Sequence, residues 1–307
     1  MLAVLLATSC STGMEKSHSP RRTVAVEKYD IEGTKFFGGL TPAKLRAVDP
    51  CALLRATNLS QYGVPGSYGN GQFGSCSLPM TDHSGAAMDL ALFMNNSDSD
   101  VGENRIGGLP AAVKKASSGP CLVRVAFQGS DGTAYTPQAL GLQVDSKLPD
   151  PCSPAVQIMT DVVEQLRTDP PIANRSPAEL AGIDPCFLLD PLAGRDPQAS
   201  ATTKPKPRGL YECVWEAPSG VRVDVSFASG PAGDGELPPV DIGGVVAKVT
   251  PKPQEDSCRI EWEHRQPPGS WVGIEKIVVV LTNHGPVDRC ADAVGIAREV
   301  KSKMPPA

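Results

Sequence analysis

The sequence predicts an α+β fold built as two tandem homologous modules. Each module is expected to be an antiparallel sheet of about four strands, with N- and C-terminal helices packed on it and two disulfides. The first observation is the cysteine spacing, which is 25, 45 and 31 positions in one set of four and 27, 45 and 32 in the next. An even cysteine count at a repeated spacing indicates a duplicated, disulfide-stapled unit. The two sets are Cys51, Cys76, Cys121 and Cys152, and Cys186, Cys213, Cys258 and Cys290.

The second observation is that the repeat extends beyond the cysteines. Asp49-Pro50-Cys51 returns as Asp184-Pro185-Cys186, and each is followed two residues later by Leu-Leu. Ile106-Gly107-Gly108 returns as Ile242-Gly243-Gly244. Met88–Phe93 matches Val223–Phe227, with Asp89 and Asp224 as the shared central acid. A chain of 307 residues accommodates two such modules, each able to bury a core.

Each module is expected to begin with two helical stretches. Thr41-Pro42 has the N-cap and N1-proline pattern of a helix start, and Asp49 caps a second stretch over Cys51–Thr57. The second copy repeats this pattern at Ser176-Pro177 and at Asp184-Pro185-Cys186.

Strands follow the helical stretches. In the second copy Val221, Val223, Val225 and Phe227 alternate with polar residues, which predicts a strand with one buried face. Each module closes with an amphipathic helix, over Pro154–Arg167 and Ala291–Lys303. The predicted strands are Cys76–Met80, Ala87–Met94, Cys121–Val125 and Leu140–Val144, then Tyr211–Glu216, Val221–Ala228, Cys258–Trp262 and Lys276–Leu281.

The N-terminal residues have the form of an export signal. Met1–Ala7 is apolar and leads into small residues directly before Cys10, the one cysteine outside the repeat. This segment resembles the lipobox of bacterial lipoproteins, although Ala7 stands where Leu is usual and no basic residue precedes it. We expect Cys10 to be lipidated, and a start codon upstream of Met1 would account for the missing basic residues.

The chain is therefore divided into five parts. Residues 1–10 are the signal peptide with its lipobox cysteine, and residues 11–40, rich in Ser, Pro and charge, are a disordered tether. The first module occupies residues 41–168 and the second residues 176–304. The proline-rich residues 169–175 between them are a semi-rigid linker.

Four cysteines allow three pairings per module, and spacing alone does not choose among them. We favour neighbours in order, because each bond would then fasten a helix to the sheet. A Cys76–Cys121 bond across adjacent strands is the alternative in the first module. The favoured pairs are Cys51–Cys76, Cys121–Cys152, Cys186–Cys213 and Cys258–Cys290.

The Asp-Pro-Cys-x-Leu-Leu motif, Cys213-x-Trp215, the Ile-Gly-Gly element and the cysteine-opened final helix resemble a family of actinobacterial cell-envelope lipoproteins of unassigned function. The resemblance covers about 41–166 and 176–304 and is closer in the second copy, since Leu78 replaces the Trp in the first. More distantly, the layout is similar to extracytoplasmic sensor domains of actinobacterial receptor kinases. The resemblance implies export and a binding or sensing role, and it supplies no catalytic residues.

Composition and motifs exclude several kinds of chemistry. A net charge of −5 without a basic cluster argues against nucleic-acid binding. No two cysteines have zinc-site spacing, and no Gly-x-Ser-x-Gly elbow or histidine shared by both repeats indicates a hydrolase. We therefore predict no catalytic residues, no cofactor and no metal. Possible ligand contacts are Trp271, in a Pro/Gly-rich hairpin, and the strand acids Asp89 and Asp224.

The predicted function is that of an exported protein, lipid-anchored to the outer face of the cytoplasmic membrane, with a non-catalytic binding role. Its expected partners are the membrane, through the lipid, and an envelope protein, glycan or lipid ligand. A sensory or regulatory accessory protein for a membrane receptor is the first alternative, and an envelope hydrolase is the second.

Overall fold

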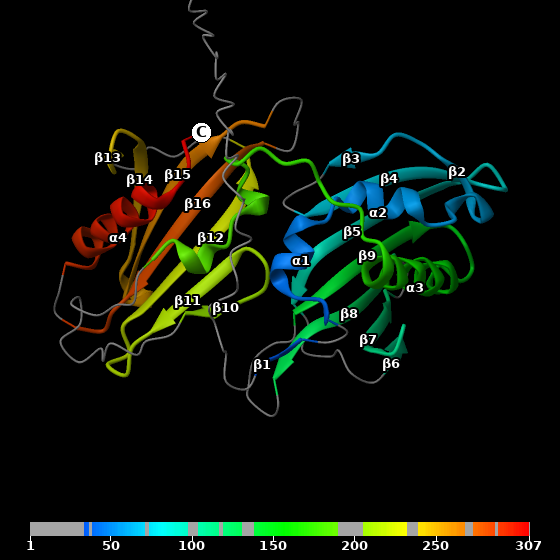
Figure 1. Cartoon of the computed structure of the whole chain (residues 1–307), viewed down its shortest axis with the longest axis horizontal. Coiled ribbons are helices and arrows are strands. Elements are labelled where there is room, and N and C mark those ends of the chain that lie inside the picture. Colours follow the sequence, from blue (N-terminus) through cyan, green and yellow to red (C-terminus); the bar gives the residue numbers. More distant parts are fainter. Residues whose placement is uncertain are drawn as a thin grey trace, which may run out of the picture.

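The chain forms two antiparallel sheets, each with its helices on one face, as seen in the computed structural model (Figure 1). The structure describes residues 34–36, 39–70, 74–97, 104–116, 119–130, 138–189, 205–231, 239–267, 273–285 and 288–306. Four disulfides form within the two halves, two in each half, and none of the four joins one half to the other. The sequence therefore predicted the duplication correctly, but the expected sheet of about four strands was too small, because the first sheet has nine strands and the second has seven.

The first sheet runs in the order β2-β4-β5-β9-β8-β7-β6, and β3 and β1 pair with β4 and β8. Its central strands β4, β5, β9 and β8 are the four that alternation predicted. The strands are β1 (Thr34–Phe36), β2 (Gly63–Pro65), β3 (Gly69–Asn70), β4 (Ser75–Asp82), β5 (Ala87–Ser97), β6 (Asn104–Ile106), β7 (Leu109–Lys115), β8 (Cys121–Ser130) and β9 (Gln138–Ser146).

The second sheet repeats this order strand for strand as β10-β11-β12-β16-β15-β14-β13. The same topology around the same cysteines shows that the two halves are copies of one module. The strands are β10 (Lys206–Pro207), β11 (Glu212–Glu216), β12 (Arg222–Gly230), β13 (Pro239–Asp241), β14 (Val246–Lys252), β15 (Ser257–Arg265) and β16 (Ile274–Thr282).

The long C-terminal helices, α3 (Cys152–Thr168) and α4 (Arg289–Lys303), cover their sheets as predicted. Met159, Val162 and Leu166 of α3 are fully buried, and Ala297 and Val300 are the buried counterparts in α4. These apolar stripes, four and three residues apart, give each helix one face to pack on its sheet.

Among the residues that the structure describes, the N-terminal helices form in the first module and not in the second. Thr41 caps α1 (Pro42–Ala47) and Asp49 caps α2 (Pro50–Ala56), as expected. In the second module the same motifs give the 3₁₀ turns η3 (Leu180–Gly182) and η4 (Pro185–Phe187), so that the helix prediction there was wrong. The sequence differs at the relevant places. Gly182 replaces Ala47, and Pro191 disfavours helix at the residue before it.

One further expectation was wrong, and one repeated motif is given a structural role. Thr34–Phe36, assigned to the disordered tether, form β1 and pair with Gln128–Ser130 of β8. The Ile-Gly-Gly element, which carried no structural prediction, is the hairpin turn that joins β6 to β7. Gly107 and Gly108 have φ of 56° and 78°, the two positive values that a type I′ turn requires.

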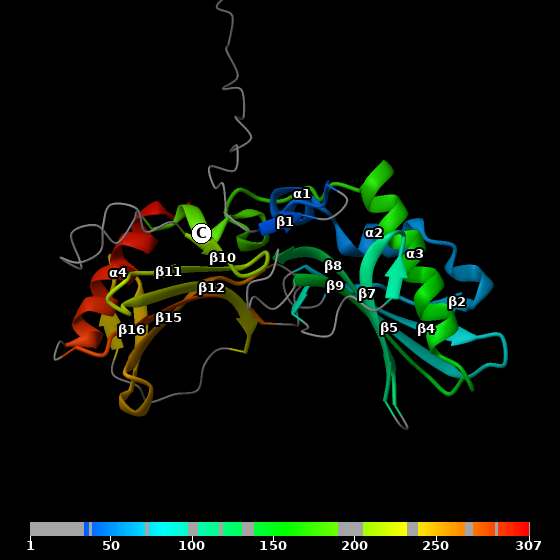
Figure 2. The same ribbon diagram turned by 90° about the horizontal axis from the view of Figure 1, so that it is seen from below.

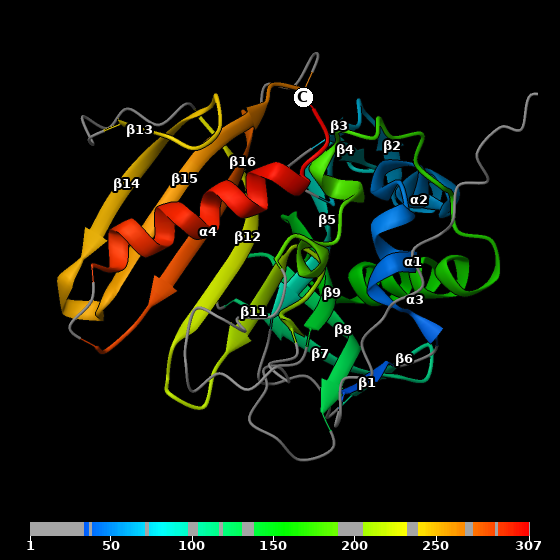
Figure 3. The same cartoon turned by 60° about the vertical axis from the view of Figure 1, so that its left-hand side comes forward.

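All of the helices that the structure describes lie on the same side of the molecule, so the sheet faces that these helices leave uncovered lie together on the other side. Figure 2 shows α1, α3 and α4 above the two sheets, which slope away from each other. Figure 3 shows α4 in front of β14, β15, β16 and β12. The helix-free faces are hereafter called the open faces.

Candidate functional site

The open face of the second module is a grid of opposite charges. Arg222 Nε donates to Asp224 at 2.8 Å along β12, and Arg259 donates to Glu261 at 2.6 Å along β15. Glu261 also meets Lys276 of β16 at 3.2 Å. Burial acts to raise the pKa of the Glu261 carboxyl, but the hydrogen bonds and charges of these two basic partners outweigh it and lower the pKa. The face is therefore charged but internally compensated.

The open face of the first module is less charged, and one of its cross-strand pairs is repulsive. Asp89 of β5 lies directly opposite Asp145 of β9, and both are exposed. Like charges in this position destabilise a sheet. Farther along the same face, Phe93 and Arg124 flank Gly141 from the two neighbouring strands. This face therefore has a negative end at Asp89 and Asp145 and a partly apolar end at Phe93.

The two acids singled out from the repeat are not at equivalent places. Cys76 lies opposite Leu92 and Cys213 lies opposite Val225, so Asp89 corresponds to Arg222 and Asp224 to Ala91. The reason is that the β4–β5 hairpin is two residues longer on each strand than the β11–β12 hairpin. Both acids do lie on open faces, but the shared spacing reflects their distance from the turns.

The other predicted site residues are placed as follows. Cys10 and Trp271 lie outside the described residues. Trp215 of the Cys-x-Trp motif is fully buried, as is Trp262 on β15. The disulfides join Cys51–Cys76, Cys121–Cys152, Cys186–Cys213 and Cys258–Cys290, the same pairs that neighbour-in-order pairing gives.

Sequence reasoning did not find the contact between the modules, which we call the seam. Arg46 of α1 donates to Asp184 of the second module at 2.6 Å and to the Leu210 carbonyl at 3.1 Å. The two side chains are only 6% and 13% exposed. Asp184 uses its other oxygen to cap η4 through the amide of Cys186. A buried ion pair that is also hydrogen-bonded fixes one geometry between the modules.

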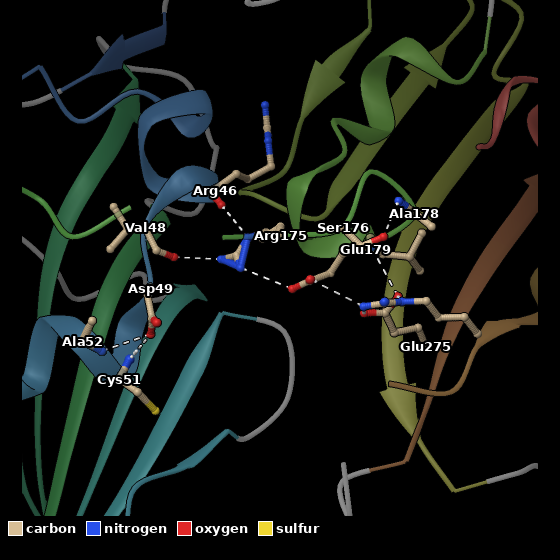
Figure 4. Close-up of polar contacts among 12 residues, drawn as sticks. Arg46, Val48, Asp49, Cys51, Ala52, Arg175, Ser176, Ala178, Glu179 and Glu275 are labelled. Atoms are coloured by element: carbon tan, nitrogen blue, oxygen red, sulfur yellow. Dashed lines mark hydrogen bonds and ion pairs between the residues drawn. The ribbon is translucent and has the colours of Figure 1, made fainter. Parts of the chain in front are cut away.

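Residues 171–180, which we call the strap, run from the linker into the second module and contact both halves. The Asp49 amide donates to the Pro171 carbonyl at 2.9 Å, and the Ala173 amide donates to the Ala47 carbonyl at 2.9 Å. Figure 4 shows Arg175 between the Arg46 and Val48 carbonyls on one side and Glu179 on the other. The predicted linker is thus a packed element.

At the centre of the seam the two copies meet at equivalent residues. Gly74 and Tyr211 each stand two residues before a strand cysteine, and the Tyr211 hydroxyl lies against Gly74. Burial raises the pKa of Tyr211 to about 12, although Arg175 and Arg46 act to lower it. Contact between equivalent residues is typical of a two-fold relation, so the seam resembles a dimer interface within one chain.

The seam leads to a stability prediction for Gly74→Ala. Gly74 has φ of +59°, and an added Cβ would lie 2.5 Å from the Tyr211 hydroxyl and 3.1 Å from Met94 Cβ. We expect a loss on the order of 1–3 kcal/mol in urea unfolding, part of which Tyr211→Phe should restore in the double variant. Gly108→Ala is the control, because φ is +78° but nothing lies within 4 Å. Equal losses in Gly74→Ala and Gly108→Ala would contradict the contact.

Two further features bear on the choice of site. A shallow open depression on the helix side is lined by Tyr62, Cys152, Ser153, Val156 and Gln157. Within the described ranges, no three His, Cys, Asp or Glu side chains converge to hold a metal ion.

None of the helices that the structure describes is long and apolar enough to cross a membrane. Comparison of the chain with family models, curated proteins and solved structures gives no match.

Proposed function

We propose that this protein is an exported, lipid-anchored component of the cell envelope that binds a protein partner through its two open faces and catalyses no reaction. Four disulfides support export, because such bonds persist in oxidising compartments. The lipid anchor rests on Cys10 and the small residues before it.

The observation that carries the proposal is the placement of the open faces. They lie on one side of the molecule (Figure 2), and the buried Arg46–Asp184 pair and the strap hold the two modules together. Two sheets fixed in this way present one composite surface. No conformational entropy is then lost in aligning the sheets when a partner binds. A binding protein benefits from that arrangement whatever the chemistry of each single face.

The chemistry of the faces supports a protein partner over a small ligand. The second module offers alternating charges such as Arg222, Asp224, Arg259 and Glu261, which suit electrostatic recognition of another protein surface. The exposed, like-charged pair Asp89 and Asp145 favours a basic group on the partner. The depression beside α3 lies on the opposite, helix-covered side.

Site-specific photo-crosslinking in cells tests this function. A crosslinking residue at Asp145 or Glu263, both exposed on open faces, should give a defined protein adduct. The control is Glu164, which is also exposed but lies on α3, and it should give no adduct. In the same cells Cys10→Ser should move the protein from the membrane to the soluble fraction. Adducts from Glu164 alone, or from no position, would contradict the assigned surface.

A further inference from the structure

The link between the first two helical elements has the same backbone shape in both modules. In the first module residues 47–49 lead from α1 into α2, and Val48 and Asp49 are extended, with ψ of 143° and 108°. In the second module residues 182–184 lead from η3 into η4, and the corresponding two residues have ψ of 140° and 115°. We call residues 47–49 the first corner and residues 182–184 the second corner. The two corners are the same local structure, formed twice.

The first corner is paired with the strap. The strap donates through the Ala173 amide and accepts through the Pro171 carbonyl, in two hydrogen bonds of 2.9 Å to this corner. The two bonds form an antiparallel β-bridge. Arg175 then donates to the Val48 carbonyl at 2.8 Å (Figure 4), whereas the Ile172 side chain is 65% exposed. The first corner therefore recognises the backbone of an extended segment and one guanidinium group.

The second corner has the same backbone groups, but the strap does not pair with them. Its Gly182 carbonyl and Asp184 amide correspond to the two groups that bind the strap, and among the described residues neither has a hydrogen-bond partner. Gly182 is exposed, and an added Cβ there would lie 3.6 Å from Cδ of Arg175, so the strap passes this corner without pairing. Ile183 is partly exposed, whereas its counterpart Val48 is fully buried. An extended backbone with an unpaired amide and carbonyl is ready to pair with another extended chain.

The difference arises from the segments that lead into the two modules. Alignment on the cysteines makes Pro171 of the strap the counterpart of Phe36 at the end of β1. Phe36 pairs with Gln128 of β8 and so stays in its own module, whereas the strap crosses to the other module. One corner is therefore filled by the crossing segment, and the other corner receives no strand from the described residues.

We propose that the second corner is a docking site for an extended segment of a protein partner, in which a proline is followed four residues later by an arginine. The strap, with Pro171 and Arg175, is the ligand of the equivalent corner and so defines this chemistry. A proline favours the extended conformation and supplies the carbonyl for the Asp184 amide. The amide two residues later donates to the Gly182 carbonyl, and the arginine reaches the Ile183 carbonyl. The second corner is separate from the open faces, so the proposal does not depend on what they bind.

The shape of the second corner favours this kind of binding. Because its backbone is extended before a partner arrives, only the partner segment loses conformational freedom. Main-chain pairing supplies the affinity, and the arginine supplies selectivity. Two backbone hydrogen bonds and one guanidinium contact make a small interface, so we expect a weak and reversible complex.

The probe that tests this site is a synthetic peptide with the sequence of residues 170–176, Pro-Pro-Ile-Ala-Asn-Arg-Ser, added to the full-length protein. Hydrogen exchange of single amides, followed by NMR, reports on the two corners separately. In the free protein the Asp49 amide should exchange slowly, because it is bonded to the strap, and the Asp184 amide should exchange fast. At about 90% occupancy the peptide should slow exchange at Asp184 by about tenfold and leave Asp49 unchanged.

Two altered peptides are the matched controls. N-methylation of the alanine that corresponds to Ala173 removes the donor to the Gly182 carbonyl. Arg175→Met in the peptide removes the guanidinium group and keeps the length of the side chain. Each altered peptide should bind about tenfold more weakly, since each loses one hydrogen bond. Equal affinity of all three peptides would contradict the proposed pairing, as would a peptide that binds without slowing exchange at Asp184.

Three further results would overturn the proposal. If the Asp184 amide of the free protein exchanges as slowly as that of Asp49, the protein's own residues fill the second corner. If protection at Asp184 rises with protein concentration in the absence of peptide, the corner binds a second copy of the chain instead of a partner. If the unmodified peptide has no effect at millimolar concentration, the corner does not bind such a segment.

Discussion

Replacing Cys258 and Cys290 together by alanine is expected to lower the free energy of unfolding of the second module by about 3–4 kcal/mol. The bond closes a loop with a sequence separation of 32, and the chain-entropy model gives a value of that size. Cys258 is fully buried in β15 and Cys290 lies in the first turn of α4, so this bond fastens the helix to its sheet. Urea unfolding with and without the bond measures the loss.

Hydrogen exchange locates the effect. Amides in α4, for example that of Val300, should lose protection, while those of α3 in the intact first module should not. Peptide mapping without reduction checks all four bonds at once, and a Cys76–Cys121 peptide would contradict the pairing. A loss well below about 1 kcal/mol, or an equal loss of protection in α3 and α4, would show that the bond does not hold α4 in place.

The sequence predicted the central strands because their side chains alternate between a core and an open face. In β12, Val223, Val225 and Phe227 are buried, and the polar residues between them are not. The sequence did not predict β7 and β14, each of which contains a proline (Pro110 and Pro251), a residue depleted in strands. These strands exist through pairing with β8 and β15. The signal that would have found them is Gly107-Gly108, a two-residue turn between short extended runs.

The false equivalence of Asp89 and Asp224 has a different cause. Alignment of the repeats by nearby residues matched the two hairpin turns, whereas sheet register is set by which residues pair across strands. Counted from the turns, the acids coincide. Counted from Cys76 and Cys213, they are two residues apart on the strand. The two hairpins differ in length by two residues on each strand. Side chains alternate between the faces with a period of two, so both acids still lie on the open face.

The seam was beyond sequence reasoning because it depends on tertiary placement. Arg46 sits in a short helix beside apolar Leu45, and nothing in its neighbourhood indicates a partner 138 positions away. Asp184 was correctly interpreted as a cap, and its second oxygen was left without a role. Only the packing of the two modules brings the charges together, and so only the structure shows how the open faces are placed relative to each other.

Arg46→Met should cost about 3–5 kcal/mol in unfolding free energy, because it leaves the carboxylate of Asp184 buried without its cation. It also removes the donor to the Leu210 carbonyl. Met keeps the length of the side chain, so the loss of packing is small. The Tyr211 ring gives a second readout, since it lies beside Arg46 and its burial depends on a closed seam. Urea unfolding and tyrosine titration measure the two effects.

The double variant Arg46→Met with Asp184→Asn separates charge from packing. Asn is also a good N-cap, so η4 keeps its cap while the buried charge is removed. We expect this variant to recover most of the loss, because an ion pair replaced by uncharged groups is often nearly neutral in stability. Lys252→Met is the control, since its pair with Glu255 is exposed and should contribute no more than about 1 kcal/mol. If Arg46→Met costs no more than Lys252→Met, the seam is not held by this pair, and the open faces are not fixed relative to each other.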